Sequence, residues 1–173
     1  MEIERKWMVT GWPTDLEAEE VYLMDQGYIS VRPTVRIRRE ELVGVKTEHV
    51  LCFKGSPIDN GLAREEIETV IDEELYQKLK NLIGLPLIHK ERRQYRLADG
   101  HVLEVNSVDP GTETAFSYAE VEFESLGEAK DWQPANAGLA EYLKNECTGI
   151  PGSSMGEYWM ETRLGFEKIW NRG

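Results

Sequence analysis

The chain begins MEIERKWMV (residues 1–9), in which charged side chains recur at every second residue from position 2 to position 6. Glu2, Glu4 and Lys6 fall on one face, and the residues between them fall on the other. This alternation predicts a β-strand with one polar face and one buried face. The fold depends on where the polar face points. It is either the solvent-facing side of an edge strand or part of an interior that needs two carboxylates beside an amine.

The same alternation recurs through the first three quarters of the chain, with turn signals such as Asp99-Gly100 between the alternating segments. We predict eight strands, at residues 2–9, 20–31, 34–40, 48–55, 63–70, 87–98, 101–108 and 115–124. An antiparallel sheet with this number of strands is large enough to close into a barrel.

Three helices are predicted, at residues 73–83, 136–147 and about 154–170. Asp72 is a suitable N-cap for the first helix and Gly84 a suitable end. The third helix rests on an aromatic stripe with a 3.6-residue period. The predicted class is α+β, in one domain over residues 1–173. An eight-stranded antiparallel β-barrel occupies about 2–124, helices pack outside it, and a helical region occupies about 125–173.

The composition restricts the function. A formal charge of −12 disfavours nucleic acids and anionic membranes as partners, because the long-range field repels both. No apolar run is long enough to cross a bilayer, and the acidic N-terminus does not suit a secretory signal. Cys52 and Cys147 lack metal-site spacing, so we expect a cytoplasmic protein with reduced thiols. A homodimer is compatible with the sequence, which does not fix the oligomeric state.

Several strands carry like charges two residues apart on their polar face. The pairs are Glu2/Glu4, Arg36/Arg38, Glu66/Glu68, Lys90/Arg92 and Glu120/Glu122. For any single strand, an ordinary solvated face explains such a pair. Neighbouring like charges repel, however, so the recurrence of these pairs suggests a demand other than stability.

If the barrel closes with its charged face inward, the interior holds fourteen ionisable groups. The basic ones are Lys6, Arg36, Arg38, Lys54, Arg64, Lys90 and Arg92; the acidic ones are Glu2, Glu4, Glu66, Glu68, Glu104, Glu120 and Glu122. Burial of so many charges is costly unless each is paired or bound to a ligand. A polyanion together with hard divalent cations satisfies both sets, since arginine and lysine bind phosphate and carboxylates bind Mg²⁺ or Mn²⁺.

These residues resemble those of a known family. EIERK (2–6) fits the ExExK signature of the CYTH, or triphosphate tunnel metalloenzyme, family. The matching segments that follow, in the family's order, are VRIR (35–38), CFKG (52–55), REEIE (64–68), KERRQY (90–95), LEVN (103–106) and AEVEF (119–123). The resemblance covers residues 2–124. It implies an eight-stranded tunnel that binds a small-molecule triphosphate with Mg²⁺ or Mn²⁺.

The resemblance also implies roles for individual residues. Glu2, Glu4 and Lys6 are the expected catalytic group. The expected substrate contacts are Lys6, Arg36, Arg38, Lys54, Arg64, Lys90, Arg92, Glu120 and, in the C-terminal region, Arg163. The expected metal ligands are Glu2, Glu4, Glu66, Glu68, Glu104, Asn106 and Glu122, although the division of roles among Glu66, Glu68 and Glu120 is open. Asn106 departs from the family, which usually has aspartate there, so one metal site is expected to be weaker.

The leading functional hypothesis is metal-dependent hydrolysis of inorganic tripolyphosphate. One alternative is a thiamine or nucleoside triphosphatase; a thiamine group would need an aromatic platform, for which Trp7, Trp12 and Trp159 are candidates. A class IV adenylate cyclase is disfavoured because such enzymes carry extra residues before ExExK. A non-catalytic polyphosphate or nucleotide sensor, favoured only by Asn106, and a purely structural barrel are the remaining alternatives.

Overall fold

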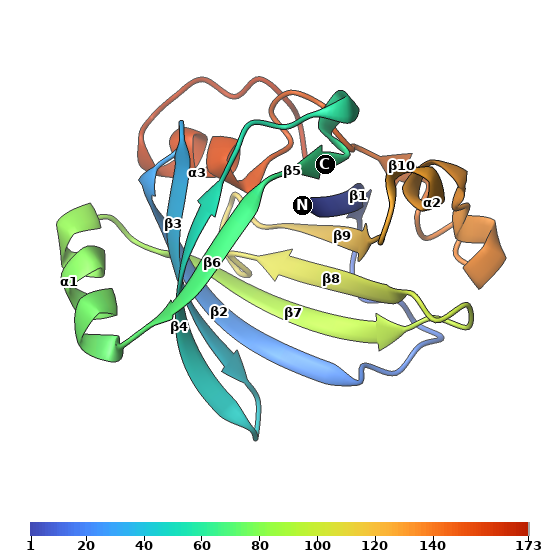
Figure 1. Ribbon diagram of the computed structural model, residues 1–173, viewed down its shortest axis with the longest axis horizontal. Coiled ribbons are helices and arrows are strands. Elements are labelled where there is room, and N and C mark those ends of the chain that lie inside the picture. Colours follow the sequence, from blue (N-terminus) through green and yellow to red (C-terminus); the bar gives the residue numbers. More distant parts are fainter. Residues whose placement is uncertain (173) are drawn as a thin grey trace.

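A single antiparallel sheet, strongly curled, forms most of the computed structural model, which describes residues 1–172 (Figure 1). The strands are β1 (Glu2–Val9), β2 (Glu20–Ser30), β3 (Thr34–Leu42), β4 (Lys46–Lys54), β5 (Ala63–Arg64), β6 (Glu66–Ile71), β7 (Ile88–Arg96), β8 (Val102–Val108), β9 (Phe116–Glu122) and β10 (Asn145–Glu146). The helices are α1 (Glu73–Ile83), α2 (Leu126–Asp131) and α3 (Met155–Arg163), with 3₁₀ turns at Asp59–Gly61 and Pro134–Ala137.

The strand order makes the sheet a nearly closed barrel. Nine strands follow the order β10-β1-β9-β8-β7-β2-β3-β4-β6, and β5 pairs with β1 instead. The β5 register places Arg64 opposite Glu2 and Ala63 opposite Ile3, so the chain just before β6 joins the two ends of the sheet. The predicted strand 63–70 is therefore divided at Glu65 between two partners, and β10 was not predicted. The predicted barrel is confirmed in its antiparallel, tunnel-like form, but closure is partial.

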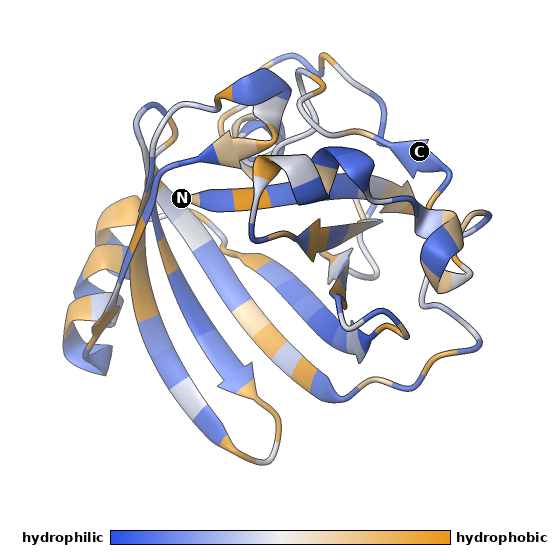
Figure 2. Cartoon of the chain, turned by 45° about the vertical axis from the view of Figure 1, so that its right-hand side comes forward, coloured by the Kyte–Doolittle hydropathy of each residue, from blue (hydrophilic) through white to orange (hydrophobic). Residues whose placement is uncertain are grey.

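The register settles the orientation of the first strand. Across β1 and β9, Glu4 lies opposite Glu122 and Lys6 lies opposite Glu120, while Trp7 lies opposite Ala119. Trp7 is 1% exposed and packs on the outside of the barrel against Trp132, with ring centroids 5.9 Å apart. Hydrophilic and hydrophobic bands alternate along the strands in Figure 2. The apolar face of the sheet therefore points outward under covering segments, as predicted.

Two buried apolar clusters lie between the sheet and these covering segments. One surrounds Trp7 and Trp132, beside α2. The other contains Tyr76 from α1 and Tyr158 and Trp159 from α3. In Figure 1, α1 and α2 lie on opposite sides of the barrel. Most of the hydrophobic core is thus outside the barrel wall. The second cluster also contains Tyr28 and Tyr118 from the inner face, most of which is left to charged groups.

The first predicted helix is confirmed in both its bounds and its caps. The Asp72 side chain accepts a hydrogen bond from the Leu75 amide (2.7 Å), and Gly84 ends the helix with φ 67°. No helix among residues 1–172 is both long enough and apolar enough to span a membrane.

The other two helix predictions need correction. Residues 136–147 form the end of a 3₁₀ turn, which stops at Gly138 (φ 72°), and then the short β10. Leu139 and Leu143 are nonetheless buried. Their four-residue spacing therefore indicated correctly that both side chains are buried, but it did not indicate a helix. The third helix ends at Arg163 rather than near 170, and Gly165 follows with φ 74°. The short α2, capped by the Ser125 hydroxyl, was not predicted, and the fold is mostly β.

Candidate functional site

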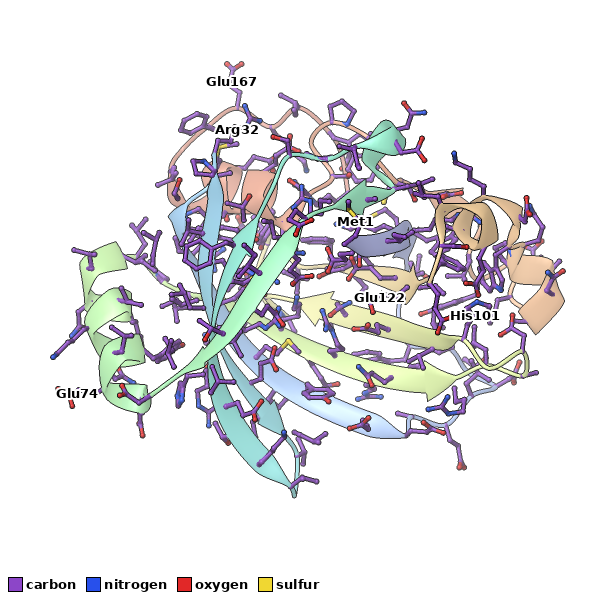
Figure 3. All side chains as sticks on the ribbon, in the orientation of Figure 1. Met1, Arg32, Glu74, His101, Glu122 and Glu167 are labelled. Carbon is purple, nitrogen blue, oxygen red and sulfur yellow. The ribbon has the colours of Figure 1, made fainter. Side chains whose placement is uncertain are left out.

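The barrel encloses a cavity of about 970 Å³. All of the ionisable side chains assigned to the interior from the sequence line it, namely Lys6, Arg36, Arg38, Lys54, Arg64, Lys90 and Arg92 with Glu2, Glu4, Glu66, Glu68, Glu104, Glu120 and Glu122. Figure 3 shows Glu122 inside the outline of the barrel, whereas Glu74 on α1 extends away from it. The structure thus brings together charges from strands that are distant in sequence.

The mouth of the cavity is formed by loops. Residues around Arg32, around Pro57 and around Ile150 line it. The second and third of these loops meet at Gly61 (φ 86°) and Gly149 (φ 69°), where a Cβ on Gly61 would lie 2.4 Å from the Gly149 Cα. Only glycine fits both positions, so this contact fixes one side of the mouth.

A cluster of three carboxylates occupies one wall. Single carboxylate oxygens of Glu2, Glu4 and Glu122 all lie within 4.8 Å of one another. Burial, followed by the neighbouring charges of Glu120 and Glu2, raises the pKa of Glu4 well above its usual value. Partial burial and the charges of Glu104 and Glu2 raise the pKa of Glu122 to about 7. Mutually repelling carboxylate oxygens of this kind fit a hard divalent cation.

Glu120 differs from this cluster because it faces the basic side chains. Burial by itself raises the pKa of Glu120, but a hydrogen bond with Glu4 and the charges of Lys6 and Arg92 outweigh it and lower the pKa to about 2. The pKa values of Glu4 and Glu120 are thus shifted in opposite directions, because Glu4 faces other carboxylates and Glu120 faces cations.

Some of the basic groups have carboxylate partners. Lys54 Nζ lies 2.9 Å from Glu2 Oε1, and Arg92 contacts Glu104 Oε2 at 2.7 Å. Arg38 contacts Glu40 and, at 3.2 Å, Glu68 Oε1. These ion pairs hold the side chains across the interior and partly offset the cost of burying their charges.

Of the seven basic side chains named above, the remaining four have no carboxylate within 4.0 Å among residues 1–172: Lys6, Arg36, Arg64 and Lys90. Arg36 is 8% exposed and its Nε has no hydrogen-bond partner. Lys6 Nζ donates to the Ser153 carbonyl (2.7 Å), and Lys90 Nζ donates to the Tyr118 hydroxyl (3.0 Å). Burial and the charges of Arg92 and Arg38 lower the pKa of Lys90 well below its usual range. This wall of the cavity therefore requires an anion.

The structure does not bring two of the predicted site residues to the cavity. Asn106 is fully buried, does not line the cavity, and accepts a hydrogen bond at Oδ1 from Arg92 Nε (2.9 Å). Arg163 contacts Asp109 Oδ2 (2.8 Å) and donates to the carbonyls of Pro86 and Leu87, also away from the cavity. Arg163 is the last residue of α3, and the residues of this helix that do line the cavity, Met155, Gly156 and Glu157, are at its other end.

Other lining residues were missed because the sequence argument followed charges only. Tyr28 on β2 and Tyr118 on β9 line the cavity. Gln26, on the same face of β2 as Tyr28, is fully buried, and neither polar atom of its amide has a partner. The alternation of β2 would have placed these neutral residues on the inner face. Cys52 also faces inward and forms a second close group with Glu66 and Glu68.

Comparison with known proteins supports this fold. The chain matches no protein-family profile and no curated protein sequence. The structure resembles that of the inorganic triphosphatase NE1496 (22% identity, TM-score 0.59, covering 91% of this chain and 93% of that one). It also resembles PH1819 from Pyrococcus horikoshii OT3 (21%, TM-score 0.63, covering 94% and 100%).

A third similar structure is that of HpAC1 from Hippeastrum, a putative adenylyl cyclase described as having a dominant triphosphatase activity (17% identity, TM-score 0.59, covering 93% and 96%). At these identities the likeness concerns the fold. The predicted resemblance to triphosphate tunnel enzymes is thus confirmed at the level of the barrel, over nearly the whole length of each chain.

Proposed function

We propose that this protein is a metal-dependent triphosphatase of the triphosphate tunnel class, with inorganic tripolyphosphate as its substrate. One observation carries the proposal. A single cavity has a wall of cations that form no ion pair within 4.0 Å, beside a cluster of mutually repelling carboxylates. The first feature requires a polyanion and the second a divalent cation, and metal-bound triphosphate supplies both.

Glu2, Glu4 and Glu122 are the residues that would hold Mg²⁺ or Mn²⁺, because their oxygens converge and burial raises the pKa of all three carboxyl groups. A divalent cation there would neutralise phosphate oxygens and lower the pKa of the attacking water. Glu66 and Glu68, which gather around Cys52, are proposed as a secondary acidic group.

The basic residues would bind and orient the substrate. Arg36 and Arg92 present guanidinium groups suited to bidentate phosphate contacts, and Lys6 and Lys90 act as point charges. Hydrolysis joins a water oxygen to a terminal phosphorus and breaks the bridging P–O bond, so orthophosphate and pyrophosphate leave. These fixed positive charges would stabilise the negative charge spread over the transferred group.

The surroundings of the cavity favour an inorganic substrate over thiamine triphosphate. None of Trp7, Trp12 and Trp159 lines the cavity. Trp7 and Trp159 belong to the outer clusters, and Trp12 packs against the guanidinium of Arg93 (3.9 Å). These three tryptophans pack outside the cavity, so they do not provide an aromatic platform for a thiamine group.

The test is release of orthophosphate from tripolyphosphate by the purified protein, with Mg²⁺ or Mn²⁺ and with EDTA as control. We expect metal-dependent release from tripolyphosphate and slower release from ATP and thiamine triphosphate. Formation of cyclic AMP from ATP would indicate a cyclase instead. Tight tripolyphosphate binding without release, at any pH at which the protein is folded, would indicate a non-catalytic sensor and contradict the proposal.

A further inference from the structure

Tyr118 lies between two of the cations that lack a carboxylate partner. Its hydroxyl oxygen accepts a hydrogen bond from Lys90 Nζ at 3.0 Å. Its ring lies beneath Lys6 Nζ, which is 4.3 Å from the ring centroid. One side chain on β9 thus contacts the ammonium groups of residues on β1 and β7. The register of β8 and β9, which places Tyr118 opposite Asn106, fixes its backbone position.

These contacts lie at the inner end of the cavity. Lys90 is 3% exposed and Tyr118 is 2% exposed, yet both line the cavity. The Tyr118 ring belongs to the apolar cluster that includes Val108 and Met155, and Phe116 stacks on it with ring centroids 5.9 Å apart. Apolar packing therefore supports the ring and limits its movement.

Charge at this end is strongly unbalanced. Burial lowers the pKa of Lys90 most, and the charges of Arg92, Arg38 and Arg36 lower it further against the opposing charge of Glu120, so positive groups outnumber negative ones around the ammonium. Cation–π attraction and a hydrogen bond to a neutral phenol hold an ammonium in place without cancelling its charge. A carboxylate in the position of Tyr118 would cancel it. The tyrosine thus keeps two positive charges available to an anion.

We propose that Tyr118 is a positioning residue that fixes the ammonium groups of Lys6 and Lys90 as a subsite for the terminal phosphoryl group of the substrate. This inference rests on the proposed function and specifies that a terminal phosphoryl group, rather than the central one, occupies the inner end of the cavity. A terminal phosphoryl group carries more negative charge than the central one and is bonded to only one bridging oxygen. It therefore matches a buried position with two ammonium groups and little solvent access.

The experiment compares two probes that both contain three phosphates, linear tripolyphosphate and cyclic trimetaphosphate, which has no terminal phosphoryl group. Affinities are measured by titration calorimetry in EDTA, where the metal-dependent reaction does not proceed. Tyr118→Phe keeps the ring under Lys6 and removes only the acceptor for Lys90. Tyr142→Phe is the matched control, since the Tyr142 hydroxyl donates to the Gly11 carbonyl outside the cavity.

We expect Tyr118→Phe to weaken binding of linear tripolyphosphate about tenfold, the effect of losing one hydrogen bond to a charged group. Binding of the cyclic probe should change much less, so the preference for the linear probe falls. The control variant should bind both probes as the wild type does. An unchanged affinity for the linear probe in Tyr118→Phe, or an equal loss for both probes, would overturn the inference.

A double-mutant cycle makes the result independent of any loss of stability. If Tyr118 acts through Lys90, Tyr118→Phe combined with Lys90→Met should bind the linear probe no more weakly than Lys90→Met alone. Additive losses would show that Tyr118 does not position Lys90. The proposed function and this inference are refuted by different results. Wild-type protein that neither binds nor hydrolyses tripolyphosphate refutes the function, whereas an active wild type with an unaffected Tyr118→Phe variant refutes only this inference.

Discussion

Glu4 on β1 lies directly opposite Glu122 on β9, and oxygens of both carboxylates lie within 4.8 Å of each other and of Glu2. Like charges placed opposite each other in a ladder destabilise a sheet. The arrangement is therefore understandable where a cation binds between them.

Arg36→Met is predicted to leave the protein folded and to impair tripolyphosphate binding by about 10- to 100-fold, because Arg36 is buried without a carboxylate partner. Thermal unfolding and calorimetric binding measure the two effects. Removal of an unpaired buried charge should leave the unfolding temperature unchanged or raise it.

Arg38→Met is the comparison variant for Arg36→Met, because the two arginines differ in whether they have carboxylate partners. Arg38 is paired with Glu40 and Glu68, so its removal should lower stability as well as affinity. If Arg36→Met unfolds the protein, the charged interior serves the structure rather than a ligand.

Arg163→Ala is predicted to destabilise the protein by about 3–5 kcal/mol, because it leaves the Asp109 carboxylate buried and without its ion-pair partner. Burial raises the pKa of Asp109, but hydrogen bonds from Arg163 and Tyr158 outweigh it and hold the pKa below its usual value. Chemical denaturation measures the loss, and affinity per folded molecule should be unchanged. Lys78→Ala, which removes an exposed pair with Glu74, is the control. If Arg163→Ala weakened tripolyphosphate binding without lowering stability, Arg163 would instead be a substrate-binding residue.

Asn106→Asp is predicted to raise the KM for tripolyphosphate without changing the metal requirement. Asn106 contacts Arg92, not the cavity, so the new carboxylate would neutralise a guanidinium that already pairs with Glu104. Steady-state kinetics over a range of Mg²⁺ concentrations distinguishes the two effects. A several-fold fall in the half-saturating Mg²⁺ concentration would instead show that position 106 contributes to a metal site.

The pH dependence of stability should include a contribution from His101, far from the cavity. Burial lowers the pKa of His101, but hydrogen bonds with Asp99 and Glu128 outweigh it, so the folded-state pKa is raised. A raised pKa gives stability that is fully present below pH ~6.5 and is lost as the pH rises through the folded-state pKa. His101→Gln should therefore lower the unfolding temperature more at pH 5.5 than at pH 8.5.

His49→Gln provides the comparison for that experiment, since His49 packs against the ring of Tyr76. A His101→Gln effect of equal size at both pH values would contradict this prediction, because it would mean that the charge of the imidazolium does not contribute to stability through Asp99 and Glu128.

The sequence predicted the barrel and its charged interior because strand alternation is a local property. Once Glu2, Glu4 and Lys6 share a face, the period of two places every other side chain of that strand. The same reasoning on β3 and β9 brought Arg36 and Glu122 into the same cavity. Strand alternation says nothing about Arg163, which was assigned from the family resemblance alone, and no local pattern reports its long-range contact with Asp109.

The neutral residues of the cavity were harder to predict. Tyr118 has the same parity as Glu120 and Glu122, so its inward direction was available, but an isolated tyrosine on a strand usually packs in a core. Only the contacts with Lys6 and Lys90 distinguish its role. Likewise Leu139 and Leu143 have helical spacing yet lie in a segment with a Gly138 turn, where tertiary burial overrides local preference.

The central claim is tested most directly by a crystal structure of the protein soaked with tripolyphosphate and Mn²⁺, with the metal located from its anomalous signal. The account predicts a triphosphate in the barrel, in contact with Arg36 and Arg92, and Mn²⁺ bound by Glu2, Glu4 and Glu122. Tripolyphosphate bound only outside the barrel, or Mn²⁺ absent from those three carboxylates, would contradict it.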